Sequence, residues 1–98
     1  MVSIRENWSD IVGVIHSLSP AADLKDFLIA VVLIEQVRPV EGFANLLDEA
    51  FGTELPIYVP QTLASIHHLA PGTRITCMVR RANLQRVFVF PDHLSTSS

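Results

Sequence analysis

The chain has 98 residues, of which 49% are hydrophobic and 17% charged, and its formal net charge at pH 7 is −3. This length provides one hydrophobic core, so we expect a single domain. The acidic balance argues against a protein that binds nucleic acid mainly through non-specific phosphate contacts, because such proteins are usually basic overall. The charged fraction is low compared with about 25% in a typical domain. It predicts exposed apolar surface, and therefore a homo-oligomer or a protein partner.

Cysteine content and apolar runs predict the compartment. The single cysteine, Cys77, excludes an internal disulfide and favours a reducing environment. The first residues lack the basic segment followed by an apolar run that marks a secretory signal. The longest apolar run, residues 27–34, is too short to span a membrane. We therefore expect a cytoplasmic protein without membrane contact.

The first half of the chain gives mixed signals. Residues 1–8 are polar and predict an N-terminal arm. Residues 11–18 suit a helix capped by Ser9, but the β-branched residues around Gly13 suit a strand equally well. Residues 27–34 are continuously apolar, which is typical either of a strand buried on both faces or of a buried helix. We favour the strand.

A break at residues 38–42, which include Pro39 and Gly42, ends this apolar run. Residues 43–51 follow and are compatible with a short inserted helix. The apolar face of that helix would consist of Phe43, Leu46, Leu47 and Ala50.

From residue 54 onward the pattern is clearer. Residues 54–60 alternate as a strand, with Tyr58 on the face opposite its apolar neighbours and Pro60 at its end. Residues 62–69 predict a two-turn helix whose apolar side includes Leu63 and Ile66. The Ala-Pro-Gly sequence at 70–72 then suits a type II turn, because proline fixes one φ and glycine accepts a positive φ.

Two more alternating strands are predicted at residues 73–81 and 86–91. In the first, Cys77 shares a face with Ile75 and Val79, so we expect a buried and unreactive thiol. In the second, valines alternate with phenylalanines up to Pro91, which ends the predicted strand.

One short helix between the third and fourth strands of a closed sheet is the arrangement of the OB-fold. We therefore expect a mainly β protein, with a small five-stranded OB-like barrel over residues 9–92 and this helix between strands three and four. Residues 93–98 are expected to form a frayed tail. The alternative is an α+β fold with a helical N-terminal half.

Residues 41–92 resemble the OB-fold domains that bind single-stranded nucleic acid. The resemblance is carried by Gly-Thr-Glu-Leu-Pro-Ile-Tyr-Val-Pro at 52–60 and by Leu-Ala-Pro-Gly-Thr-Arg-Ile at 69–75. The run Glu-Gly-Phe-Ala at 41–44 looks loosely like the glycine-aromatic entry of a cold-shock strand. The resemblance implies a binding groove bounded by the loop between the last two strands, with single-stranded DNA or RNA as the partner.

Arginine is concentrated in the predicted last hairpin: four of the six arginines lie between residues 74 and 86, whereas nine of the ten acidic residues precede Leu55. Guanidinium groups suit phosphates and stack on bases, and aromatic rings add stacking surface. The alternative is a solvated face that protects an edge strand. The predicted nucleic-acid-binding residues are Tyr58, Arg74, Arg80, Arg81, Arg86 and Phe88.

These patterns predict a non-enzymatic single-stranded nucleic-acid-binding protein. The alternative is a protein-interaction or assembly module on the same barrel, with Phe88, Phe90 and residues 43–51 as its contact surface. The sequence contains no nucleotide-binding loop and no nucleophile beside a base, so neither catalysis nor a cofactor is expected. His67 and His68 point about 100° apart on a helix, so we expect no metal site.

Overall fold

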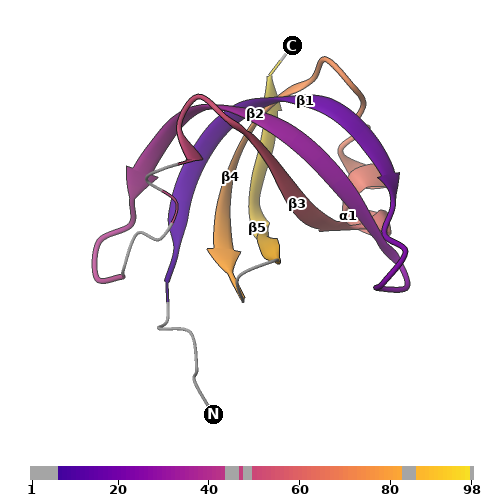
Figure 1. The fold of residues 1–98 in the computed structure, drawn as a ribbon. Coiled ribbons are helices and arrows are strands. Elements are labelled where there is room, and N and C mark those ends of the chain that lie inside the picture. Colours follow the sequence, from indigo (N-terminus) through magenta and orange to yellow (C-terminus); the bar gives the residue numbers. More distant parts are fainter. Residues whose placement is uncertain (1–6, 44–46, 48–49, 83–85, 98) are drawn as a thin grey trace.

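Five strands close into a barrel in the computed structural model, which describes residues 7–43, 47, 50–82 and 86–97 (Figure 1). The elements in chain order are β1 (Ser9–Pro20), β2 (Phe27–Pro39), β3 (Glu54–Pro60), α1 (Gln61–Ile66), β4 (Arg74–Arg81) and β5 (Val87–Ser97). Around the barrel the order is β1-β2-β3-β5-β4, and β4 pairs back to β1. The β3–β5 pair is parallel, and the other neighbouring strands are antiparallel. The predicted mainly β barrel with a helix between its third and fourth strands is therefore confirmed.

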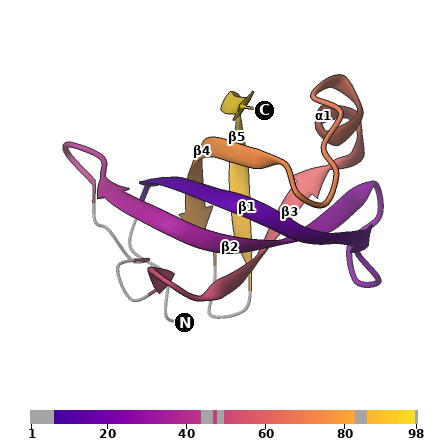
Figure 2. The same cartoon turned by 90° about the horizontal axis from the view of Figure 1, so that it is seen from above.

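The ambiguous N-terminal half forms the two longest strands, so the alternative of a helical N-terminal half is wrong. Figure 1 shows β1 and β2 arching together across the barrel, and Figure 2 shows α1 beside β3 at one end. Register shifts between Val12 and Gly13 and between Ile15 and Ser17 mark bulges in this pair. Bulges increase local twist, which lets long strands wrap around a small barrel.

The core is built from the inward face of every strand. Alternation predicts this directly, because successive side chains of a strand point to opposite faces. Helix α1 adds Leu63 and Ala64 to the same core. The largest fully buried apolar side chains are Ile11, Ile15, Ile34, Leu47, Ile57, Ile75, Val32, Val59, Val79 and Val87. Cys77 is also buried, as predicted, and this burial raises the pKa of its thiol to about 12.

The sequence predicts that the last strand ends at Pro91. In the structure this strand, β5, continues to Ser97. β5 pairs with β4 at both ends, with Val89 opposite Val79 and Leu94 opposite Cys77. The register shift between these two pairs places Pro91 in a bulge. Proline is tolerated in a bulge because no ladder hydrogen bond is needed from its nitrogen. The C-terminal residues up to Ser97 therefore belong to the sheet.

The remaining boundaries differ in smaller ways. Helix α1 ends at Ile66, which is 71% exposed and so does not belong to an apolar face. Residues 41–43 form a turn rather than the start of a strand. Most of the alternative helix at 43–51 lies outside the described residues. Its two ends, Phe43 and Phe51, are exposed.

Two residues of the predicted N-terminal arm are packed against the barrel. Asn7 is fully buried: its Oδ1 accepts a 2.9 Å hydrogen bond from the Arg81 backbone N–H, and its Nδ2 donates one of 2.9 Å to the Arg81 carbonyl. The Trp8 ring packs edge-on against Phe90, with centroids 5.0 Å apart. The start of β1 is thus fixed to the end of β4 and to β5.

Candidate nucleic-acid interface

Three aromatic side chains meet on the outside of the barrel, where β2, β3 and β5 are adjacent. We call Phe27, Tyr58 and Phe88 the aromatic cluster. Tyr58 points outward because Ile57 and Val59 point into the core, and Phe88 lies opposite it in the parallel pairing. The Tyr58 and Phe88 ring centroids are 5.3 Å apart, and Phe27 meets Phe88 edge-on at 5.8 Å. The cluster therefore brings aromatic rings from three strands into contact.

An ion pair between Asp23 and Arg86 joins two loops beside this cluster. Asp23 lies between β1 and β2, and Arg86 directly precedes β5. The Nη2 of Arg86 donates to Asp23 Oδ2 at 2.8 Å, and its guanidinium carbon lies 5.7 Å from the centre of the Tyr58 ring. The Tyr58 hydroxyl donates to the same carboxylate, at 2.9 Å from Oδ2 and 3.1 Å from Oδ1. Tyr58 is therefore only 7% exposed although it faces outward.

These contacts change the acidity of all three groups. The Tyr58 hydroxyl first, and the Arg86 guanidinium second, lower the pKa of Asp23 below its ordinary 3.8. The hydrogen bond to the Asp23 carboxylate raises the pKa of Tyr58, and the same carboxylate raises the pKa of Arg86. At neutral pH the contact between Asp23, Arg86 and Tyr58 therefore contains one carboxylate, one guanidinium and one neutral phenol.

The lowered pKa of Asp23 gives a pH prediction. Because this pKa is lower in the folded protein, the contribution of the contact to stability is present above the unfolded value and is lost as pH falls through the folded value. A carboxyl ¹³C NMR titration should therefore give Asp23 a midpoint below 3.8. The variants Tyr58→Phe and Arg86→Gln should each raise that midpoint. A midpoint at or above 3.8 in the unaltered protein would contradict the contact.

The remaining predicted arginines lie in three different settings. Arg80 is exposed and lies opposite Phe88 in the β4–β5 register, and no ion-pair partner for its guanidinium is found among the described residues. Arg81 is half-buried, and its backbone is held by Asn7. Arg74 lies at the opposite end of β4, where its Nε and Nη2 donate to the Glu35 carboxylate at 2.9 and 3.1 Å. The fold thus gathers Arg80 and Arg86 around the aromatic cluster and leaves Arg74 elsewhere.

Two members of this site are absent from the predicted set, Asp23 and Phe27. Both come from the connection between the first two strands or its edge. In OB-folds the loop between strands 1 and 2 and the loop between strands 4 and 5 border the same face. Applied to residues 21–27, this rule points to Asp23 and Phe27. Only the fold brings Asp23 to Arg86, across 63 positions of sequence.

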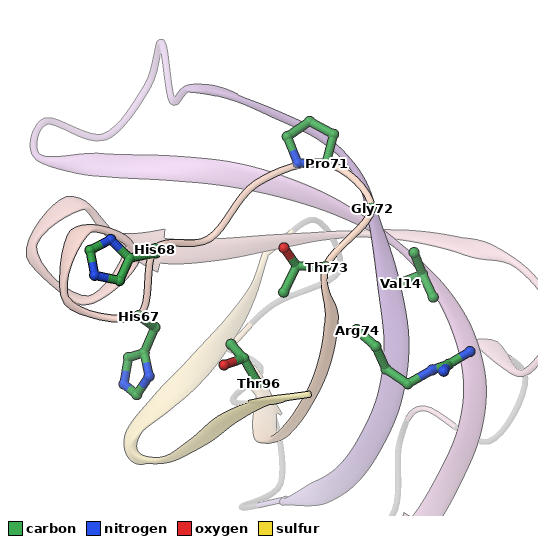
Figure 3. A pocket seen from close by; sticks show the side chains of 8 residues that line it. All are labelled: Val14, His67, His68, Pro71, Gly72, Thr73, Arg74 and Thr96. Atoms are coloured by element: carbon green, nitrogen blue, oxygen red, sulfur yellow. The ribbon is translucent and has the colours of Figure 1, made fainter. Parts of the chain in front are cut away.

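A separate hollow of about 670 Å³ lies at the end of the barrel near α1 (Figure 3). It is lined by His67, His68 and Arg74, among others. In Figure 3 the Arg74 guanidinium points away from both imidazole rings, and it is engaged by Glu35. The described residues contain no group of three potential metal ligands. The hollow therefore shows no convergent set of ligand-binding groups.

No protein-family model, curated protein or solved structure matches the chain. Within the described residues, no helix has the length and apolar character required to cross a bilayer.

Proposed function

We propose that this protein binds single-stranded nucleic acid across the aromatic cluster and catalyses no reaction. The observation that supports this most strongly is the position of Phe27, Tyr58 and Phe88, with Arg80 and Arg86 beside them. This face lies between the β1–β2 and β4–β5 connections, the region with which OB barrels bind oligonucleotides.

The chemistry of the face suits a flexible single strand. Each base stacked on an aromatic side chain contributes about 1–3 kcal/mol, with little sequence preference. Phe27 and Phe88 are partly exposed and offer such surface in the unbound protein. Arg80 is exposed at the edge of the cluster and is suited to contact a phosphate. A duplex, whose bases are stacked internally, cannot use the rings in this way.

When no ligand is bound, the Asp23 carboxylate is paired with the Arg86 guanidinium. A phosphate offers the same kind of oxygen acceptors as the Asp23 carboxylate and can replace it on the guanidinium. Movement of Arg86 from Asp23 to a phosphate would uncover the Tyr58 ring for stacking. The ligand thus exchanges one ion pair for another, which predicts moderate rather than very tight affinity.

Binding should depend on salt in proportion to the few arginines involved. A single-stranded ligand gives a slope of about −0.7 in log K against log salt for each neutralised phosphate, so contacts from Arg80 and Arg86 predict a slope near −1.4. Tenfold more salt should therefore weaken binding by about 25-fold. Fluorescence anisotropy with labelled DNA and RNA single strands measures this directly.

The matched control is a duplex of the same length and label. We expect the single strand to bind more tightly than the duplex at every salt concentration. Absence of binding to both DNA and RNA single strands at low salt would overturn the proposed function. Equal affinity for the duplex would overturn the role of the aromatic cluster.

A further inference from the structure

Asp23 is an unfavourable residue for a surface that contacts phosphates. Its carboxylate lies at the rim of the aromatic cluster, 2.9 Å from the Tyr58 hydroxyl and 2.8 Å from Nη2 of Arg86. A carboxylate repels a polyanion and offsets the charge of the arginine beside it. The Asp23 side chain is also 46% exposed, so a ligand that covers the cluster meets it directly. The carboxylate is favourable in this position only if the ligand brings hydrogen-bond donors to it.

The guanidinium of Arg86 shows which kind of donor group fits between Asp23 and Tyr58. It is planar and presents its N–H bonds side by side. Its central carbon lies 5.7 Å from the centre of the Tyr58 ring, while Nη2 donates to the Asp23 carboxylate. The group thus combines an aromatic contact with a hydrogen bond to a carboxylate. A ligand group that replaces it must be planar, able to stack on a ring and equipped with adjacent N–H donors.

Guanine is the nucleic-acid base that meets these requirements. Its Watson–Crick edge carries N1–H and the N2 amino group side by side, on an N–C–N unit like that of the arginine guanidinium. These two parallel donors match the two oxygens of a carboxylate, as in a bidentate arginine–carboxylate pair. Each of the other bases would place an acceptor against the carboxylate: a ring nitrogen in adenine and cytosine, and carbonyl oxygens in thymine and uracil. A duplex cannot offer this edge because it is already paired, whereas a single strand can.

We propose that Asp23 gives the site a preference for guanine, whose Watson–Crick edge replaces the Arg86 guanidinium on the carboxylate while Arg86 moves to a phosphate. This inference rests on the proposed function, because it assigns a base preference to the same surface. The two donors of guanine compensate the carboxylate for the loss of its ion pair. Stacking on the rings has little sequence preference, so the preference comes from Asp23.

Hypoxanthine provides the test, because it lacks the N2 amino group of guanine but keeps N1–H and the same rings. Fluorescence anisotropy compares two short thymidine strands that differ only in one central base, guanine or hypoxanthine. A bidentate contact to a base discriminates by about fivefold or more, and we expect a value near that lower limit because Asp23 is partly exposed. This comparison uses the unaltered protein and does not depend on the folding of any variant.

Asp23→Asn should bring the ratio of the two affinities close to one. The amide has a single oxygen, which accepts from N1–H of either base, so the N2 amino group no longer adds a bond. The ratio reports base recognition separately from the overall affinity, which this variant changes by releasing Arg86. Glu35→Gln is the matched control, because it makes the same change from carboxylate to amide beside Arg74. It should keep the ratio of the unaltered protein.

The outcomes separate this inference from the proposed function. Equal binding of both strands by the unaltered protein would overturn the guanine preference and leave the proposed function in place. A preference that persists in Asp23→Asn, or that is lost in folded Glu35→Gln, would overturn the role of Asp23. Failure of both strands to bind at low salt would overturn the proposed function, and this inference with it.

Discussion

Gly13→Ala is expected to lower the free energy of unfolding by about 2–3 kcal/mol, because overpacking inside a barrel forces the backbone to shift. A Cβ atom at Gly13 would lie 2.5 Å from the Leu33 carbonyl oxygen and 2.5 Å from Val32 Cγ1. The carbonyl belongs to β2 and cannot move without disturbing the longest strand pair of the barrel. Glycine is therefore required here by close approach of the neighbouring strand.

Urea unfolding followed by circular dichroism measures this loss. Gly42→Ala is the matched control: Gly42 has a φ of +88°, and among the described residues no atom beyond its chain neighbours lies within 4 Å of the added Cβ. The control places a Cβ atom at a positive φ, which strains an L residue, and should cost about 1–2 kcal/mol. If Gly13→Ala proved as stable as the unaltered protein, the close packing of β1 on β2 at this bulge would be wrong.

The triple variant Arg80→Ala, Arg81→Ala, Arg86→Ala is expected to abolish measurable binding to single strands at moderate salt. The structure sharpens this expectation, because Arg80 and Arg86 border the aromatic cluster, whereas Arg81 is half-buried and lies opposite the core residue Val87. The double variant Arg80→Ala, Arg86→Ala should therefore show most of the loss. It should also flatten the salt slope by about 1.4, or about 0.7 for each lost phosphate contact.

Arg74→Ala is the matched control for the single variants Arg80→Ala and Arg86→Ala, because each of the three removes one positive charge. Its guanidinium faces Glu35 at the other end of β4, so affinity should change little. Asp23→Asn moves the system in the opposite direction: it releases Arg86 and should tighten binding several-fold. Equal losses for Arg74→Ala and for either single variant, Arg80→Ala or Arg86→Ala, would mean that net charge, rather than this site, governs binding.

The second half of the barrel could be predicted because its local signals agree. Residues 54–60 alternate cleanly, and β3 (Glu54–Pro60) has those same bounds. The predicted turn before β4 also has the expected glycine conformation, since Gly72 adopts a positive φ of +92°. Each of these features depends on neighbouring residues, which a sequence displays directly.

The strands of the first half could not be predicted in the same way, and the structure gives the physical reason. Periodicity distinguishes a strand from a helix only when one face is polar. In β2 the outward Val31 and Leu33 are as apolar as the inward Val32 and Ile34, so no period of two appears. The apolar outward face of β2 is therefore the source of the ambiguity in the sequence.

The candidate site was predictable only in part because its decisive contacts are long-range. The hydrogen bond between Arg86 and Asp23 spans 63 positions, and those between Asn7 and Arg81 span 74. The positions of the arginines in the sequence show that they cluster in the last hairpin. It could not show that Arg74 pairs with Glu35 or that Arg86 covers Tyr58. These pairings depend on which strands become neighbours in the closed barrel.

An ¹⁵N–¹H NMR titration with a short single-stranded oligonucleotide tests the central claim most directly, since it reports where the ligand binds. We expect the largest shift changes at Tyr58, Phe88 and Arg80 and in the segment around Asp23, with little change at the amides of Val12 and Val14. The side-chain resonance of Arg86 should also move as it leaves Asp23. Absence of shifts at saturating oligonucleotide, or shifts confined to the hollow near His67 and His68, would contradict the proposed nucleic-acid interface.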